Sequence, residues 1–209
     1  MFEKEKIIYS EISRKPQFNY DSEKNYLSNT AYLINSEKIN LKYLLGLLNS
    51  NVIFWIFKHI SYNLGENSYR FIKHFVEHLP IKFTNKNHEK RINKLVEEQL
   101  TTNKKQTTES TNFKKWLKTT FQIDKLFNKL ENYYELTFEE FLKELSKKKV
   151  KTKNRQTQEL LRLEHDKSTK YIKELKSQIK MLDDELNQEI YKIYDLIEDE
   201  IKIIEKDIR

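Results

Sequence analysis

The sequence contains no cysteine, and it has only two glycines and two prolines among its 209 residues. The absence of cysteine excludes disulfides and thiolate-bound metals, and it fits a reducing cytoplasm. So few glycines and prolines disfavour a turn-rich all-β fold and favour long helices. No glycine-rich phosphate loop, dinucleotide-binding fingerprint or cysteine nucleophile is present. We therefore expect no cofactor and no catalytic activity from this polypeptide by itself.

Long apolar runs are also missing. The most apolar stretch, LLGLLNSNVIFWIF, lies between Lys42 and Lys58 and is broken by Asn49, Ser50 and Asn51. A membrane span needs about 20 mostly apolar residues, so this stretch predicts a buried core helix. The opening FEKEKIIYSEIS is charged and alternating, unlike a signal peptide. We expect a cytoplasmic protein without a membrane partner.

Charge is abundant and unevenly distributed along the chain. The net charge is +7, with 11 basic and 8 acidic side chains in residues 1–82, 18 and 10 in residues 83–155, and 10 and 14 in residues 156–209. A basic body suits a polyanionic partner such as nucleic acid. Lysine-rich helices are also often plain solvated surfaces, so charge alone leaves both interpretations open.

The first part of the chain predicts a compact α+β unit. Residues 6–13 and 26–35 mix alternation with β-branched and aromatic side chains, which is typical of strands. A polar loop that contains Pro16 separates them. Asn40 is expected to cap a helix that runs from Leu41 to about His59.

A loop at residues 63–68 and a short helix follow. That helix must end near Leu79, because Pro80 disfavours the α conformation before it. We place the end of this first domain at residue 84, so it covers residues 1–84.

The remainder of the chain is predicted to be helical. A helix over His88–Leu100 precedes a linker or bent segment, TTNKKQTTESTN. Thr137 and Glu140 form the pattern of a capping box at the start of another helix, which ends in the basic run KKKVKTKNR. We assign residues 85–155 to a helical region with a linker and a basic loop.

The last segment, residues 156–209, shows the sharpest periodicity. Its apolar side chains recur in steps of 4, 4 and 3, which predicts one long amphipathic helix. Such a stripe needs a partner, either the preceding helices folded back antiparallel or another chain. The fold class is thus α+β, a small mixed domain followed by an antiparallel coiled-coil-like region. The repeating positions are Tyr171, Leu175, Ile179, Leu182, Leu186, Ile190, Ile193, Ile197, Ile201 and Ile204.

The pentapeptide HFVEH matches a spacing that some zinc peptidases use. Two histidines four residues apart need a long helix, a third ligand and an open cleft to make a catalytic zinc site. Pro80 follows His78 by two residues and curtails the helix. We therefore expect no metal site, and we regard a zinc hydrolase as a weaker hypothesis than the two that follow.

Several segments taken in order resemble a known family. They are KIIYSEISRKPQFNYDSEKNYLSNTAYLI, the block YLLGLLNS at residues 43–50, YRF at residues 69–71 and EHLPI at residues 77–81. Together they resemble the TaqI-like C-terminal specificity domain, the target-recognition domain of type IIG restriction–modification enzymes and related adenine methyltransferases. The segments LTFEEFLKELSKKKVK and LDDELNQEIYKIYDLIEDEIKIIE resemble the helical tail of the same proteins. That tail commonly carries a Tyr-Gly-Leu-Thr turn, whereas this chain has Asp195 and Ile197 at the glycine and threonine positions. Without the glycine, we expect the terminal helix to run uninterrupted.

The resemblance implies a non-catalytic specificity subunit or C-terminal fragment that binds double-stranded DNA. Its partner would be a methyltransferase or endonuclease region, with a homodimer through the helical region as a further option. We expect base edges to be read by the loop after the first strand and by a second loop that leads into a helix start, where backbone amides could hold a phosphate. The chosen residues are Arg14, Lys15, Gln17, Asn19 and Tyr20 in the first loop, and Asn63, Asn67, Ser68, Tyr69, Arg70 and Lys73 in the second. Pro16 stiffens the first loop, and Phe18 with Tyr20 would anchor it.

The competing hypothesis is a coiled-coil scaffold without any role in nucleic-acid binding, which leaves the aromatic-rich first domain unexplained.

Overall fold

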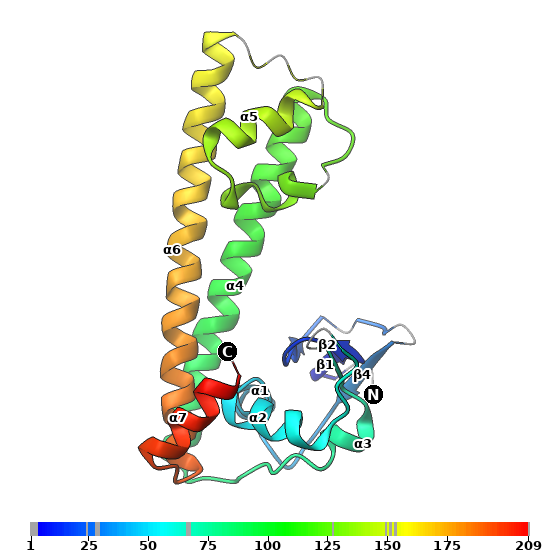
Figure 1. Ribbon diagram of the computed structural model, residues 1–209, viewed down its shortest axis with the longest axis vertical. Coiled ribbons are helices and arrows are strands. Elements are labelled where there is room, and N and C mark those ends of the chain that lie inside the picture. Colours follow the sequence, from blue (N-terminus) through cyan, green and yellow to red (C-terminus); the bar gives the residue numbers. More distant parts are fainter. Residues whose placement is uncertain are drawn as a thin grey trace. The chain divides into compact units, whose positions relative to one another are not determined.

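We describe the protein from a computed structural model. The structure describes residues 4–23, 25–27, 30–65, 68–126, 128–148, 150, 152 and 154–208. The chain divides into two compact units, a head unit of residues 1–98 and 182–209 and a helical unit of residues 99–181. Two long helices, α4 (Lys86–Phe121) and α6 (Arg155–Ile193), contribute to both units (Figure 1). The α+β fold class is confirmed.

The head unit contains a three-stranded antiparallel sheet. Its central strand, β1 (Lys6–Ser10), lies between β3 (Asn19–Asp21) and β4 (Ala31–Ile34). β1 and β4 fall inside the two predicted strands. β3 lies in the segment that we predicted as a loop, and that prediction is wrong. A long-range contact accounts for β3, because the buried Lys6 ammonium lies 2.7 Å from the Asp21 carboxylate across the strand pair.

A two-stranded ribbon follows the sheet. The predicted strand 6–13 is divided at Glu11, whose amide donates to the Thr30 carbonyl and whose carbonyl accepts from the Phe71 amide. Beyond it, β2 (Ile12–Ser13) pairs antiparallel with β5 (Tyr69–Arg70). The chain therefore leaves the three-stranded sheet at Glu11 and enters the two-stranded ribbon.

Two short helices form the next layer of the head. Asn40 caps α1 (Leu41–Leu48) as predicted, since its Oδ1 accepts from the amides of residues 42 and 43. The predicted single helix to His59 is interrupted, because Ser50 caps a second helix, α2 (Asn51–Ile60), through the Ile53 amide.

The head helices pack closely on the parts of α4 and α6 that belong to the same unit. A Cβ atom on Gly46 of α1 would lie only 3.0 Å from a methyl group of Ile92 and 3.1 Å from one of Val96. Glycine therefore permits this close approach. On the other side, the N-terminus of α2 is held by α6, since the Asn51 amide donates to Asn187 Oδ1 at 2.8 Å.

The expectation of an uninterrupted terminal helix is wrong. α6 ends at Ile193, and a separate helix, α7 (Glu198–Asp207), follows. Asp195 adopts a left-handed conformation with φ of 56°, and the Leu196 amide donates back to the Tyr191 carbonyl. This is a helix-terminating motif in which glycine usually occupies the left-handed position. Aspartate is among the few other residues that tolerate this conformation, so the turn persists without glycine.

The helical unit is built from α4, a 3₁₀ segment η1 (Asn128–Glu135), a third helix α5 (Phe138–Ser146) and α6. α4 runs continuously through TTNKKQTTESTN, so the predicted linker is wrong. The helix continues because Thr102, Phe113 and Leu117 bury one side of it. The capping box before α5 is confirmed, with Glu140 and Thr137 each accepting from the other's amide.

The periodic stripe of the last segment is buried within the chain over most of its length, with Ile197 exposed. In the head unit Leu182, Leu186 and Ile190 are buried, and in the helical unit Leu175 is buried while Tyr171 is exposed. None of the helices in the described part of the chain has an apolar stretch of the length needed to cross a bilayer. Within the predicted basic loop, Lys149, Lys151 and Lys153 lie outside the described residues.

Candidate nucleic-acid interface

The β2–β5 ribbon brings the two predicted loops together. Ser13, the last residue of β2, pairs with Tyr69, the first residue of β5. Because the strands are antiparallel, the loop that leaves β2 and the loop that enters β5 lie at the same end of the ribbon. Asn63 forms a further bridge to Tyr69 and continues this arrangement on the other side. Residues about 50 apart in the sequence thus share one edge of the head.

The first loop is fixed at its base and exposed along its length. Phe18 is buried, its ring 4.9 Å from that of Tyr9, and its amide and carbonyl groups both bond to the Asn49 side chain. Phe18 therefore anchors the loop, as predicted. The side chains predicted to reach DNA project from this anchored base, and the exposed ones are Arg14, Lys15, Gln17 and Asn19. A rigid base lowers the entropy that such side chains lose on binding.

One carboxylate lies close to the first loop. Asp183 of α6 is influenced by the positive charge of Lys15, which favours the ionised carboxylate. Burial is the larger effect and raises the pKa of Asp183 above its usual range, with a further increase from Asp184. Lys15 is therefore partly balanced by acid, whereas Arg14 has no such neighbour among the described interactions.

The second loop is closed by its own backbone. The Leu64 amide donates to the Ser68 carbonyl at 2.8 Å, and the Ser68 amide donates to the Gly65 carbonyl at 2.9 Å. Gly65 has a φ of 91°, a conformation that a side chain would strain. The Asn63 side chain accepts from the Gly65 amide. Asn67, one of the predicted contacts, lies outside the described residues.

The two basic side chains after this loop differ in freedom. Arg70 Nε donates to Glu11 at 2.7 Å, yet half of its side chain is exposed and its terminal amino groups remain as donors. Lys73 is highly exposed and lies 3.9 Å from Glu77. It begins α3 (Lys73–Val76), whose four residues are too few for the predicted phosphate site at a helix N-terminus.

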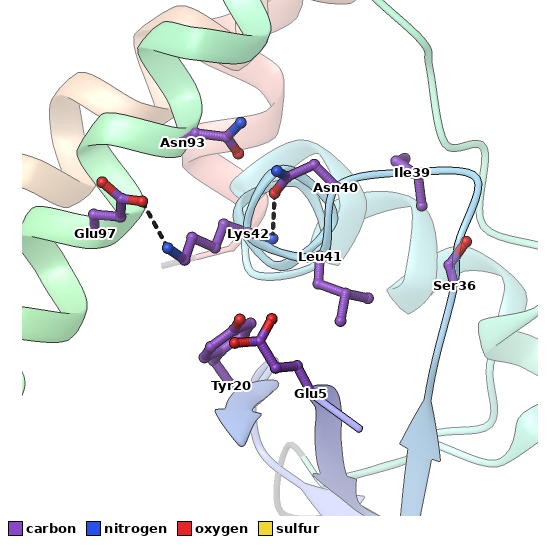
Figure 2. A pocket seen from close by; sticks show the side chains of 9 residues that line it. All are labelled: Glu5, Tyr20, Ser36, Ile39, Asn40, Leu41, Lys42, Asn93 and Glu97. Carbon is purple, nitrogen blue, oxygen red and sulfur yellow. Dashed lines mark hydrogen bonds and ion pairs between the residues drawn. The ribbon is translucent and has the colours of Figure 1, made fainter. Parts of the chain in front are cut away.

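Two of the predicted aromatic contacts are not exposed side chains. The Tyr69 ring is 6% exposed and packs edge-on against Phe54 and Phe57, so it supports the ribbon from within the core. Tyr20 lines a hollow on another part of the head, beside Glu5 (Figure 2). We leave both rings out of the proposed interface.

The hollow itself has the wrong chemistry for a phosphate. Its volume is about 350 Å³, and it is lined by two carboxylates, Glu5 and Glu97, against one lysine. Figure 2 shows Lys42 joined to Glu97, and the two charged atoms are 2.6 Å apart. Burial is the main cause that raises the pKa of Tyr20, and the Glu5 carboxylate adds to it.

Sequence reasoning missed three exposed apolar side chains beside the predicted loops. Ile12 lies in β2, and Tyr62 and Leu64 flank Asn63, with 58%, 73% and 51% of their surfaces exposed. Apolar side chains in a DNA interface can contact the methyl group of thymine. The sequence contains a signal for two of them. Tyr62 and Leu64 flank Asn63 beside a segment that was predicted to be a loop, where apolar side chains are not expected to be buried.

The histidines of HFVEH do gather near a carboxylate. His74, Glu77 and His78 place ligand atoms within 4.8 Å of one another, and all three are exposed. His78 Nδ1 faces the His74 carbonyl at 2.5 Å, which leaves its other ring nitrogen for a metal. His74 lies in α3, whereas Glu77 and His78 follow the last residue of that helix, and Lys73 lies 3.9 Å from Glu77. It could hold a divalent cation at the surface, and our expectation of no metal stays a prediction.

Comparison with known families assigns both parts of the chain. Residues 1–81 match the TaqI-like C-terminal specificity domain. These residues belong to that family. The match covers the sheet, the ribbon and both candidate loops, so the proposed interface lies inside a DNA-specificity domain of the kind found in restriction–modification enzymes.

A second family covers most of the remainder. Residues 85–190, about half of the chain, match a domain of unknown function, DUF8810, and the chain belongs to this family. It begins four residues after the TaqI-like specificity domain ends. No curated protein matches the chain.

Proposed function

We propose that this chain is the sequence-specific DNA-recognition part of a type IIG-like restriction–modification enzyme, either as a specificity subunit or as a C-terminal fragment. It is non-catalytic by itself and directs an adenine methyltransferase or endonuclease to its site. The supporting observation is the convergence of two exposed polar loops at one end of the β2–β5 ribbon of a TaqI-like specificity domain.

The residue types at this edge suit duplex recognition. In the major groove, arginine bonds guanine through two donors, and asparagine or glutamine pairs with adenine in the same way. We assign base reading to Arg14, Gln17 and Asn19, and phosphate contacts to Lys15 and Lys73. Asn63, Asn67, Ser68 and Arg70 complete the proposed set. Arg70 would bind with its terminal amino groups, because Glu11 holds its Nε.

The helical region would couple recognition to the methyltransferase or endonuclease. Its buried stripe needs no second chain. A homodimer through this region would therefore have to use exposed side chains of α6, such as Leu160, Leu163 and Tyr171.

Selection of bound duplexes from a randomised library tests the proposed function. We expect the full chain to enrich a consensus. We also expect Arg14→Ala combined with Gln17→Ala to relax that consensus at one or two positions. A good bidentate contact gives about 1–3 kcal/mol of discrimination at a base pair.

Lys38→Ala is the matched control, because Lys38 is an exposed lysine of the head outside both loops. It should leave the consensus unchanged. If wild type enriches no consensus, the scaffold hypothesis is the better account. If the double variant selects the same consensus as wild type, the wrong loop has been assigned.

A further inference from the structure

The net positive charge of the chain resides in the helical unit. Residues 99–181 carry 20 basic and 11 acidic side chains, a net charge of +9. Residues 1–98 and 182–209 carry 19 basic and 21 acidic side chains, a net charge of −2. The net electrostatic attraction for a polyanion therefore comes from the helical unit, while the head unit contains the candidate reading loops.

One face of α4 concentrates this charge. Four lysines of its helical-unit part are exposed, and we call them the α4 lysine face: Lys104, Lys105, Lys115 and Lys118. None of the four has an ion pair or a hydrogen bond to another described residue. Lys114, by contrast, is held by Glu131 at 2.9 Å.

Apart from the lysines, the exposed side chains of residues 101–120 are small and polar. The exposed ones are Thr101, Asn103, Thr107, Thr108, Thr111, Asn112, Thr119 and Thr120. The only acidic residue of this stretch, Glu109, accepts from the buried Ser168 hydroxyl at 2.6 Å, which in turn contacts the Tyr133 hydroxyl. The Glu109 carboxylate is therefore hydrogen-bonded within the helical unit. Lysine, threonine and asparagine are all residues that donate to phosphate oxygens in DNA complexes.

The spacing on the helix suits an extended backbone of phosphates. At 3.6 residues per turn, Lys104, Lys115 and Lys118 lie within about 60° of one another around the axis, and Lys105 lies about 80° from Lys115, the nearest of the three. From Lys104 to Lys118 the face is about 21 Å long at 1.5 Å per residue. The same length of duplex carries about a dozen phosphates, so each lysine can reach one.

The exposed lysines of α6 lack this arrangement. Lys167, Lys170, Lys173 and Lys180 are also exposed and have no described ion pair, but Asp166 and Glu174 lie among them. A face of mixed sign attracts a polyanion less than a face of one sign. The two helices of one unit therefore provide a candidate surface and a matched comparison.

We propose that the α4 lysine face binds the sugar–phosphate backbone of duplex DNA independently of sequence. The choice of duplex DNA over other polyanions rests on the proposed function of the TaqI-like specificity domain. In this arrangement the helical unit provides most of the electrostatic affinity, and the ribbon loops provide the selectivity. This gives the domain of unknown function a physical role of its own.

Salt-dependent binding of the full chain to a labelled duplex of arbitrary sequence tests this proposal. Each lost phosphate contact makes the slope of log affinity against log salt shallower by about 0.9. We expect Lys104→Gln, Lys105→Gln, Lys115→Gln and Lys118→Gln combined to reduce the slope by about three to four units. The control combines Lys167→Gln, Lys170→Gln, Lys173→Gln and Lys180→Gln, which removes the same charge. It should reduce the slope by less than about one.

The outcomes separate this proposal from the proposed function. The duplex selection described above should give the same consensus for the α4 variant as for wild type. If both quadruple variants have the wild-type slope, or lower it equally, the α4 lysine face is not the binding surface, while selection by the head can still stand. If the slope falls as expected but wild type selects no consensus, this proposal stands and the proposed function fails. If the α4 variant loses binding only to phosphatidylserine vesicles or to RNA, duplex DNA is the wrong partner and the proposal is overturned.

Discussion

Asp21→Asn is expected to lower the free energy of unfolding by about 3–5 kcal/mol, because it leaves the Lys6 ammonium buried beside a neutral amide. The Lys6 side chain is 0% exposed and that of Asp21 is 2% exposed, with 2.7 Å between their charged atoms. Asp21 also accepts from the amides of Glu23 and Asn25, so one carboxylate organises the end of β3. Chemical denaturation of the full chain measures the change.

The same pair predicts a direction for pH dependence. The hydrogen bond from Lys6 is the main cause that holds the pKa of Asp21 below its usual range. A depressed pKa in the folded state means that the stabilisation is present above the unfolded-state value of about 3.9 and is lost as the pH falls further. The Asp21→Asn variant should lack this part of the acid dependence.

Two further variants make the result interpretable. Glu37→Gln removes a carboxylate from the exposed pair with Lys4, and an exposed pair contributes little, so its denaturation curve should match that of wild type. Lys6→Met combined with Asp21→Leu replaces both charges with apolar groups and should recover most of the loss. Equal stability of wild type and Asp21→Asn would contradict the assigned role of the buried pair.

Phe57→Ala is expected to cost about 3–5 kcal/mol of stability, the usual range for emptying an aromatic position in a core. Phe57 is 1% exposed, and its ring stacks on that of Phe71 with 4.0 Å between centroids. Edge contacts to Tyr69 and Phe75 extend the cluster beneath β5 and α3. The Phe57 ring therefore supports the β2–β5 ribbon, from which both loops extend.

Phe83→Ala is the matched control, because Phe83 is 71% exposed in the same unit. Its free energy of unfolding should stay within about 0.5 kcal/mol of wild type. A Phe57→Ala protein as stable as the Phe83→Ala protein would show that the aromatic cluster does not support the head as described.

Local signals predicted the features that depend on local chemistry. The Asn40 cap and the Thr137–Glu140 capping box each need only a side chain and the backbone of the next turn, and both are confirmed. The α+β class followed from segment patterns in the same way. The motif order that identified residues 1–81 is confirmed by the family match.

Features that depend on distant contacts could not be predicted. β3 exists because Asp21 meets Lys6 and because Asn49, from another element, holds the Phe18 backbone. The segment TTNKKQTTESTN has weak helix propensity, yet packing of Thr102 on one side and Phe113 beyond keeps it helical.

The candidate interface was predicted in part. The two loops were chosen separately, and only the pairing of Ser13 with Tyr69 shows that they lie at one end of a ribbon. Tyr69 is buried and Tyr20 lines the hollow beside Glu5, and neither placement could be predicted, because the exposure of an aromatic residue cannot be read from a short polar stretch. The difference in net charge between the two units could not be predicted from the sequence either, because the boundary between the units falls inside α4 and inside α6.

Amide hydrogen exchange of the full chain, with and without the duplex recovered by selection, tests the assignment of the loops most directly. We predict slowed exchange at residues 12–19 and 62–70, because backbone at the ribbon end would be covered by the groove. A mutated duplex should give weaker protection there at the same salt concentration. Protection confined to the hollow lined by Glu5 and Glu97, or no protection within residues 1–81, would contradict the assignment of these loops as the DNA-reading surface.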